Sequence, residues 1–402
     1  MDTRSNRVIV KFGGGELSSG GAYKEAAKMV KESGYEEIVV VVSAMKGTTD
    51  NLIKCVTEVG GVEDADYSDI VAMGERISAR IFCSALKSLG TRATYFDPQQ
   101  ERWPIITDSN FKDATPDINE TRRRVKKYLE PLLGNYVPVV CGFIGKDKNG
   151  HVTTLGRGGS DITATLLGNC LKADEVILVK NTSGVLSADP KIVKDAKPLD
   201  KITIEEMFSL AQGGAKIIHP EALKYKLPGQ KLRVVGFPGK LSSSGTEIVG
   251  VFKANPVEIR RHYGLSAITL VGEISPSNLN KILPVFDGRK IFGMGTSRNS
   301  ITVFVDSKNP IKVVNQICRL NYFKAVSLRE NVAAIELVSP NFIDSPGWVA
   351  KMSGALAEKG INILEVITNK ASITIFIDKD KMEDALTAIK TKLKENPGLE
   401  EA

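Results

Sequence analysis

Short, continuous apolar runs alternate with longer segments of helical character over the first part of the chain. Runs such as residues 7–12 (RVIVKF) are typical of parallel strands that are covered on both faces. Further strands are expected at 37–45, 91–96, 137–144, 175–180 and 232–237, and helices at 23–33, 50–59, 69–89, 118–133 and 204–211. This alternation predicts a doubly wound α/β sheet.

After the polar segment 241–246 the pattern changes. Residues 300–306 read SITVFVD and residues 372–378 read SITIFID, which is an internal repeat. The first copy follows a strand–helix–strand pattern at 267–271, 278–287 and 289–294, and the second follows one at 333–338, 346–359 and 361–368. A helix follows each copy, at 310–320 and 381–394, so two small βαββα units are expected. Each is expected to form its own antiparallel sheet with helices on one side. Such units either bind an effector or serve only in dimerisation, and the sequence is compatible with both.

Composition narrows the class of protein. The chain has 402 residues, 42% of them hydrophobic, and a net charge of +7. It has no apolar run of about 18 residues and no signal-peptide pattern at its start, so a cytoplasmic protein is expected. The one dense basic cluster, at 122–127, fits a solvated helix face, so neither nucleic acid nor membrane is expected as a partner. The five cysteines and three histidines lack metal-ligand spacing, so no protein-held metal site is expected.

The most informative stretch is 153–168, TTLGRGGSDITATLLG. A glycine turn containing Arg157 leads into Ser160 and Asp161, which suit a helix N-cap. Open backbone N–H groups at a helix start favour an anion, and the arginine fork suits a carboxylate or a phosphate. The stretch matches neither a P-loop nor G-x-G-x-x-G. A glycine turn that merely starts a helix is the alternative.

Two lysines stand beside glycines in positions that suit phosphate binding. Lys11 ends the first apolar run and precedes Gly13, Gly14 and Gly15, which let a ligand approach the backbone closely. Lys216 follows a second glycine pair. A polar turn, 43–49, follows the second apolar run, and ligands of open α/β sheets bind at such carboxyl ends of strands.

Taken together, these residues resemble aspartate kinase, an amino acid kinase domain followed by tandem ACT domains. The resemblance spans nearly the whole chain and is carried by KFGG (11–14), SAMKGTTD (43–50), GER (74–76), GFIG (142–145), TTLGRGGSD (153–161), SGVLSADP (183–190) and GGAKIIHP (213–220). It implies an amino acid kinase-like sheet over 1–246 and two α+β, ACT-like units of the βαββαβ type, at 262–325 and 326–402.

The resemblance also implies a reaction and roles. ATP would phosphorylate the β-carboxylate of L-aspartate, giving 4-phospho-L-aspartate for lysine, threonine and methionine biosynthesis, with Mg²⁺ bridging the phosphates. The implied catalytic residues are Lys11, Asp161 and Lys216. The implied aspartate-binding residues are Gly47, Thr48, Thr49, Glu75 and Arg157. The implied nucleotide-binding residues are Lys11, Gly13, Gly14, Ser43, Arg157, Ser160, Lys180, Asn181, Leu186, Asp189 and Lys216. A homodimer or larger homo-oligomer, with lysine or threonine as a feedback ligand of the ACT units, is implied as well.

The chain departs from the family pattern at three places. Gly15 and Glu16 replace the Thr-Ser of the usual KFGGTS, and Asn181 replaces a common Asp. The first ACT-like unit has 275–278 (SPSN) where a Pro-Gly turn is usual, whereas the second keeps Pro346-Gly347. Two other functions stay open. One is another kinase of this fold, acting on glutamate, N-acetylglutamate or UMP, and the other is a non-catalytic amino-acid sensor.

Overall fold

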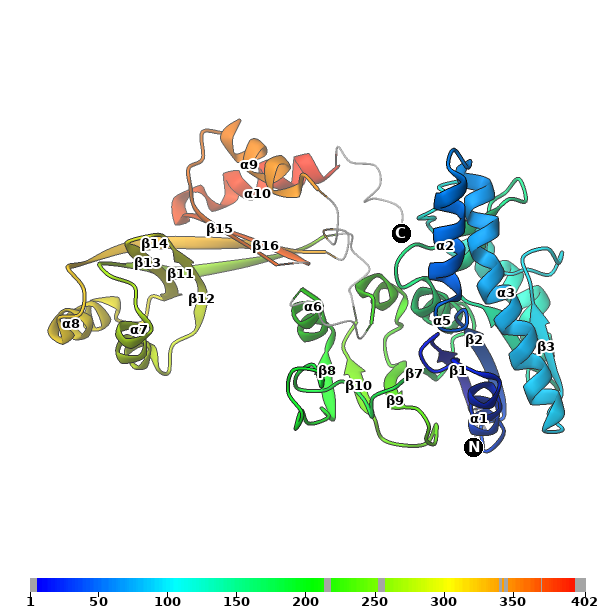
Figure 1. Ribbon diagram of the computed structural model, residues 1–402. Helices are drawn as coiled ribbons and strands as arrows, with labels where there is room; N and C mark the ends of the chain where they lie inside the picture. Colours follow the sequence, from blue (N-terminus) through cyan, green and yellow to red (C-terminus); the bar gives the residue numbers. More distant parts are fainter. Residues whose placement is uncertain are drawn as a thin grey trace, which may run out of the picture. The chain divides into compact units, whose positions relative to one another are not determined.

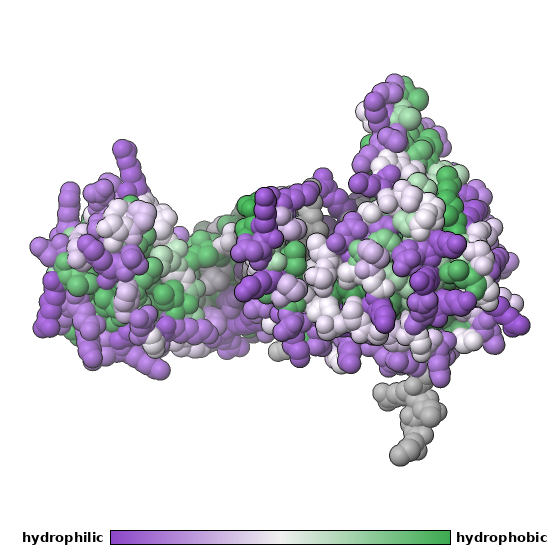
Figure 2. Space-filling view, turned by 60° about the horizontal axis from the view of Figure 1, so that its bottom comes forward, coloured by the Kyte–Doolittle hydropathy of each residue, from purple (hydrophilic) through white to green (hydrophobic). Residues whose placement is uncertain are grey.

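A computed structural model describes residues 6–212, 218–251, 257–339, 342, 346–369 and 371–394. The chain forms two compact units, Met1–Phe252 and Lys253–Ala402, which are described separately below (Figure 1). On the face shown in Figure 2, hydrophilic residues predominate and the apolar areas between them are small. No helix within the described ranges is long and apolar enough to cross a membrane.

The first unit is built on an eight-stranded sheet in the order β3-β4-β2-β1-β7-β9-β10-β8. All pairs from β3 to β9 are parallel, whereas β10 runs antiparallel to β9. The strands are β1 (Arg7–Phe12), β2 (Glu37–Val42), β3 (Ala93–Phe96), β4 (Val137–Cys141), β7 (Glu175–Lys180), β8 (Lys201–Thr203), β9 (Lys231–Gly236) and β10 (Thr246–Val249). The predicted α/β sheet is confirmed. The short strands β8 and β10 at its edge were not predicted, because their three or four residues carry too little pattern.

Helices cover both faces of this sheet, as the buried strands require. Phe12 packs against Phe82 of α3, with ring centroids 5.2 Å apart. Successive strand side chains point to opposite faces, so Lys11 points toward the other face, where it meets Asp161 of α5. The helices are α1 (Gly20–Lys31), α2 (Thr48–Val59), α3 (Asp64–Ser88), α4 (Ile118–Arg124), α5 (Gly159–Cys170) and α6 (Ile204–Gln212), with the 3₁₀ helix η3 (Pro220–Tyr225). A two-stranded ribbon, β5 (Ile144–Lys146) with β6 (Val152–Thr154), precedes α5.

The single helix predicted over 118–133 is interrupted. The α-helix α4 passes into a π-helical turn, η1 (Val125–Leu129), and then into a 3₁₀ turn, η2 (Glu130–Leu132). Pro131 lies in the last of these turns. It has no backbone N–H to continue an α-helix, which explains the change.

The second unit contains one six-stranded antiparallel sheet in the order β12-β13-β11-β14-β16-β15. The expectation of a separate sheet for each repeat was wrong. Two 14-residue strands, β11 (Glu258–Val271) and β14 (Ala325–Val338), pair along their length and run through both repeats. Only their apolar ends, 267–271 and 333–338, were predicted. The remaining parts alternate with charged residues such as Arg260 and Arg329, which hid the strand pattern.

Each repeat keeps its own helices and core. The helices α7 (Pro276–Ile282) and α8 (Pro310–Leu320) lie on one side of the long strands, and α9 (Trp348–Ala357) and α10 (Met382–Lys394) lie on the other (Figure 1). The remaining strands are β12 (Ile291–Thr296), β13 (Ser300–Asp306), β15 (Ile363–Asn369) and β16 (Ser372–Asp378). Phe304 of β13 and Phe376 of β16 point away from the helices and stack with centroids 3.8 Å apart. The two repeats therefore share a third apolar cluster, to which strands of both repeats contribute.

Candidate active site

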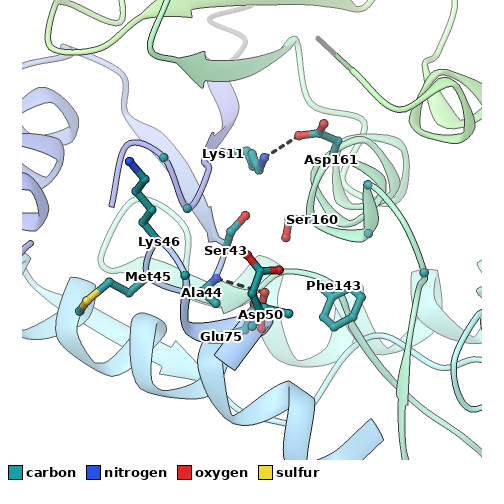
Figure 3. Close-up of a pocket in the computed structure, with 17 residues that line it drawn as sticks. Lys11, Ser43, Ala44, Met45, Lys46, Asp50, Glu75, Phe143, Ser160 and Asp161 are labelled. Atoms are coloured by element: carbon teal, nitrogen blue, oxygen red, sulfur yellow. Dashed lines mark hydrogen bonds and ion pairs between the residues drawn. The ribbon is translucent and has the colours of Figure 1, made fainter. Parts of the chain in front are cut away.

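A pocket of about 400 Å³ opens in the first unit at the carboxyl ends of β1 and β2. These strands are neighbours at the point where the strand order reverses, since β2 lies on one side of β1 and β7 on the other. Ligands of open α/β sheets bind at such a switch point. The lining residues are Lys11, Gly14, Gly15, Ser43, Ala44, Met45, Lys46, Gly47, Thr49, Asp50, Glu75, Phe143, Gly156, Gly158, Gly159, Ser160 and Asp161 (Figure 3).

Two helix starts face this pocket. The N-cap residues of α2 and α5 are Gly47 (φ 81°) and Gly158 (φ 74°), both in the left-handed conformation that glycine adopts without strain. Within the described part of the chain, no side chain caps either helix. Part of each helix start is already bonded to backbone, because Thr48 N donates to Met45 O, and Gly159 N and Asp161 N donate to Gly156 O and Gly158 O. The helix dipoles still favour negative charge at both starts. The pocket has two places where an anion is stabilised.

Two lysines converge on one buried carboxylate at the α5 side of the pocket. Lys11 Nζ lies 2.7 Å from Asp161 Oδ1, and Lys180 Nζ lies 3.4 Å from Asp161 Oδ2. Asp161 is 5% exposed, and this burial alone would raise its pKa. The two ammonium groups outweigh burial and lower the pKa of Asp161 to about 2. Burial lowers the pKa of Lys180, with Asp161 opposing that effect.

A second buried carboxylate, Glu75 of α3, lies on the α2 side of the pocket (Figure 3). It is 4% exposed, and its Oε1 accepts a hydrogen bond of 3.1 Å from Ala44 N. No described residue hydrogen-bonds its Oε2. Burial raises the pKa of Glu75 to about 7, although the Ala44 N–H and the charge of Lys11 oppose the shift. Gly74 permits this placement, because a Cβ there would lie 2.8 Å from Ala44 Cβ.

The loop after β1 folds back over the end of the pocket where Lys11 and Asp161 lie. Leu17 N donates to Gly13 O at 3.1 Å, and Lys46 N donates to Leu17 O at 3.4 Å. A Cβ at Gly15 would lie 2.7 Å from Asn181 Nδ2. Two of the three departures from the family pattern, Gly15 and Asn181, therefore lie together in space.

The structure brings together most of the residues singled out in the sequence. Of the predicted site residues, Lys11, Gly14, Ser43, Gly47, Thr49, Glu75, Ser160 and Asp161 line the pocket. Gly13 and Thr48 adjoin lining residues, and Lys180 reaches the pocket through Asp161. Arg157 is exposed between two lining glycines and does not line the pocket itself. Lys216 lies outside the described residues.

The residues Asn181, Leu186 and Asp189, predicted to bind the nucleotide, are not among those that line the pocket. Asn181 and Asp189 are exposed, and Leu186 is half-buried and bridges to Pro198. Asp189 Oδ1 accepts a hydrogen bond from Lys191 N at 2.9 Å. The roles predicted for these three residues stay predictions.

Apart from glycines, five lining residues had been assigned no role: Ala44, Met45, Lys46, Asp50 and Phe143. The first four lie in or beside the polar turn after β2, and Phe143 follows β4 with a left-handed φ of 67°. Their position at strand ends was the available signal. Their residue types alone did not single them out as binding or catalytic residues.

Comparisons with known proteins agree with this geometry. The model of the amino acid kinase family matches residues 6–236, and a model of the ACT domain matches residues 327–391. The chain is 30% identical over 411 residues to aspartate kinase of Stutzerimonas stutzeri, which covers 96% of each chain. The solved aspartate kinase from Synechocystis aligns with a TM-score of 0.75 at 24% identity, covering 96% of this chain and 69% of that one. Aspartokinase III of E. coli, solved with aspartate and ADP, aligns with a TM-score of 0.56 at 21% identity, covering 96% and 99%. At 24% and 21% identity, these two solved structures show that the chain has the same fold.

Proposed function

Because the chain belongs to the amino acid kinase family and, within it, to the aspartokinases, we propose that it transfers the γ-phosphoryl group of ATP to the β-carboxylate of L-aspartate. The product is 4-phospho-L-aspartate. One observation carries this proposal. One pocket has a lysine pair around Asp161 on one side. On the other side lies the buried carboxylate of Glu75, whose Oε2 has no hydrogen-bond partner among the described residues.

The lysine side suits the phosphates. Lys11 and Lys180 present two cations at the start of α5, where the helix dipole adds favourable partial charge. Asp161 holds both ammonium groups in place and so orients them toward the transferring group. In phosphoryl transfer, catalysis is positioning plus electrostatic stabilisation of charge on the phosphoryl oxygens. Removal of one of these lysine cations is therefore expected to slow phosphoryl transfer strongly.

The Glu75 side suits an amino acid. The Oε2 atom of Glu75 is an acceptor without a partner among the described residues, and a substrate ammonium group supplies one. The N–H groups at the start of α2, near Thr48 and Thr49, suit a substrate carboxylate. Arg157 is exposed between the lining residues Gly156 and Gly158, and it is proposed to pair with the α-carboxylate. The attacking β-carboxylate is already an anion, so this reaction needs no general base.

Mg²⁺ fits the same site. This ion is usually held by one or two carboxylates and by substrate phosphates, and Asp161 offers a carboxylate beside the phosphate position. When bound, the ion neutralises charge on the phosphate oxygens. The role of Asp161 toward the lysines does not depend on it.

The second unit is proposed to be regulatory. Its ACT-like repeats are proposed to bind a feedback amino acid such as lysine or threonine, and the chain is proposed to act as a homodimer or larger oligomer in the cytoplasm. The product would then supply lysine, threonine and methionine biosynthesis. A solved form of the E. coli neighbour contains lysine and aspartate, which supports this choice of effector.

Trapping of the acyl phosphate with hydroxylamine tests the proposal. Aspartate and ATP should give hydroxamate, while glutamate, N-acetylglutamate and UMP should give little ATP turnover. Faster turnover with any of those three acceptors would contradict the proposal. ADP binding without turnover on any acceptor would indicate a sensor instead.

A further inference from the structure

Glu16 is a buried carboxylate to which the reaction assigns no role. It is 5% exposed and follows directly on Gly13-Gly14-Gly15 in the turn between β1 and α1. The two backbone hydrogen bonds of Leu17, to Gly13 O and from Lys46 N, keep this turn over the end of β1. A charged carboxylate is rarely buried without a cation nearby.

Among the described residues, Lys11 and Lys180 are two cations whose charges act with that of Glu16. A Cβ at Gly13 would collide with Glu16 Oε2 and would lie 3.4 Å from Lys11 Nζ. The Glu16 carboxylate and the Lys11 ammonium therefore lie on the same side of the Gly13 backbone, with no side chain between them. Glu16 also acts on Lys180. Burial lowers the pKa of Lys180, and the negative charges of Asp161 and Glu16 both raise it, with Asp161 having the larger effect.

The four groups form a cluster whose formal charges cancel. Lys11 and Lys180 contribute two positive charges, and Asp161 and Glu16 contribute two negative charges. A serine or another neutral residue in place of Glu16 would leave one net positive charge for the phosphates. Charges at this depth are screened weakly by solvent and salt, so one unit matters to an incoming polyanion.

We propose that Glu16 is a resident counter-ion of the lysine pair, which holds Lys11 and Lys180 in place in the free protein and competes with nucleotide phosphates for them. It is a positioning residue and does not touch the reacting atoms. Nucleotide binding is weaker than the lysines alone would give, and ADP leaves faster. The inference rests on the proposed function, since it takes the polyanion to be the nucleotide.

Glu16→Gln tests the inference, because it keeps the shape and removes the charge. Isothermal titration of the full chain with ADP, with and without Mg²⁺, should show about tenfold tighter binding, equivalent to about 1.4 kcal/mol. The melting temperature of the ligand-free variant should fall, because the lysine pair loses a counter-ion, and saturating ADP should restore it. A residue with only a structural role would not tighten binding when altered.

Two control variants separate local from general charge effects. Glu25→Gln removes the same formal charge from the exposed face of α1, and its ADP affinity should equal that of the wild type. Glu16→Asp keeps the charge, so its ADP affinity should stay closer to wild type than that of Glu16→Gln.

Unchanged or weaker ADP binding by Glu16→Gln would overturn the inference. Weakening seen only with Mg²⁺ would make Glu16 a metal ligand and overturn it as well. Failure of the proposed function would look different, because it appears in the acceptor assay with aspartate, in wild type and variant alike, or as an absence of ADP binding by both proteins. Pyrophosphate then serves as the probe of the same lysine pair, and equal pyrophosphate affinity in both proteins would overturn the inference.

Discussion

Asp161 and Glu75 line the same pocket and are almost equally buried, at 5% and 4% exposed, yet they ionise differently. Burial raises the pKa of both carboxyl groups. Asp161 has two ammonium groups within 3.4 Å, which bring its pKa down to about 2. Glu75 has one backbone N–H and a more remote Lys11, and its pKa rises to about 7. Because the two groups are almost equally buried, the difference between their pKa values comes from the neighbouring charges.

The difference matches the two tasks proposed for the pocket. The phosphate side needs cations whose positions do not change with pH, and a permanently ionised Asp161 provides an anchor for them. The acceptor side needs an anion for the substrate ammonium, and Glu75 becomes fully charged only above neutral pH or when that ammonium arrives. Four predictions test this contrast, from the largest expected effect to the smallest.

Lys11→Met should abolish most of the activity. It removes the cation closest to Asp161 and one charge that stabilises the transferring phosphoryl group, so kcat should fall about a thousandfold. Hydroxamate trapping with ATP and aspartate measures the rate, and circular dichroism checks the fold. Activity near that of the wild type in a folded variant would refute the proposed role of the lysine pair.

The two carboxylates should differ in their effect on stability at pH 8. Asp161→Asn leaves the buried Lys11 and the half-buried Lys180 without their main partner and should lower the free energy of unfolding by about 3 kcal/mol. The stabilisation that Asp161 provides is present above its unfolded-state pKa of 3.8 and is lost as pH falls toward 2.

Glu75→Gln should behave in the opposite way. The raised pKa of Glu75 means that its contribution to stability is fully present below pH 4.5 and is lost as pH rises through 7. Glutamine carries no charge, so the variant should be more stable than wild type at pH 8, by up to about 3 kcal/mol, and similar to it at pH 4.5. Urea titrations at both pH values measure this. If Glu75→Gln lost as much stability at pH 8 as Asp161→Asn, the proposed difference between the two carboxylates would be contradicted.

The acceptor side should show a pH dependence that the phosphate side lacks. Ionised Glu75 is needed to pair with the ammonium group, so KM for aspartate should fall about tenfold as pH rises from 6 to 8. KM for ATP should stay nearly constant, since Asp161 remains ionised throughout. In Glu75→Gln the KM for aspartate should be high and should not vary over this range. An equally steep pH dependence in that variant would assign the effect to another group.

Arg157→Ala should have the smallest effect. The side chain is exposed at the rim, so its removal should leave the melting temperature unchanged. If Arg157 closes over the α-carboxylate, KM for aspartate should rise about threefold to tenfold. An unchanged KM would leave Arg157 without a part in substrate binding.

Parts of this site could be anticipated from sequence for a simple reason. Lys11, Ser43 and Lys180 end or follow strands predicted to be parallel, and such ends share one edge of a sheet. The glycine turn before Asp161 indicated a helix start at that edge. The ionisation of Glu75 could not be anticipated, because it depends on which cations lie near it in space.

In the second unit, too, the sequence predicted local elements but did not predict how they pair in space. The repeat SITVFVD and SITIFID located β13 and β16 with correct bounds. The merging of both repeats into one sheet depends on long-range pairing of β11 with β14. Half of each strand carries charged side chains, so local pattern does not indicate it.

Direct titration of Glu75 tests the central contrast best. Carboxyl ¹³C spectra of protein labelled at glutamate, recorded against pH and compared with those of Glu75→Gln, identify the one signal that the variant lacks. That signal should titrate with a midpoint near pH 7 in the ligand-free protein. A midpoint near 4.5, the ordinary value for glutamate, would contradict the account.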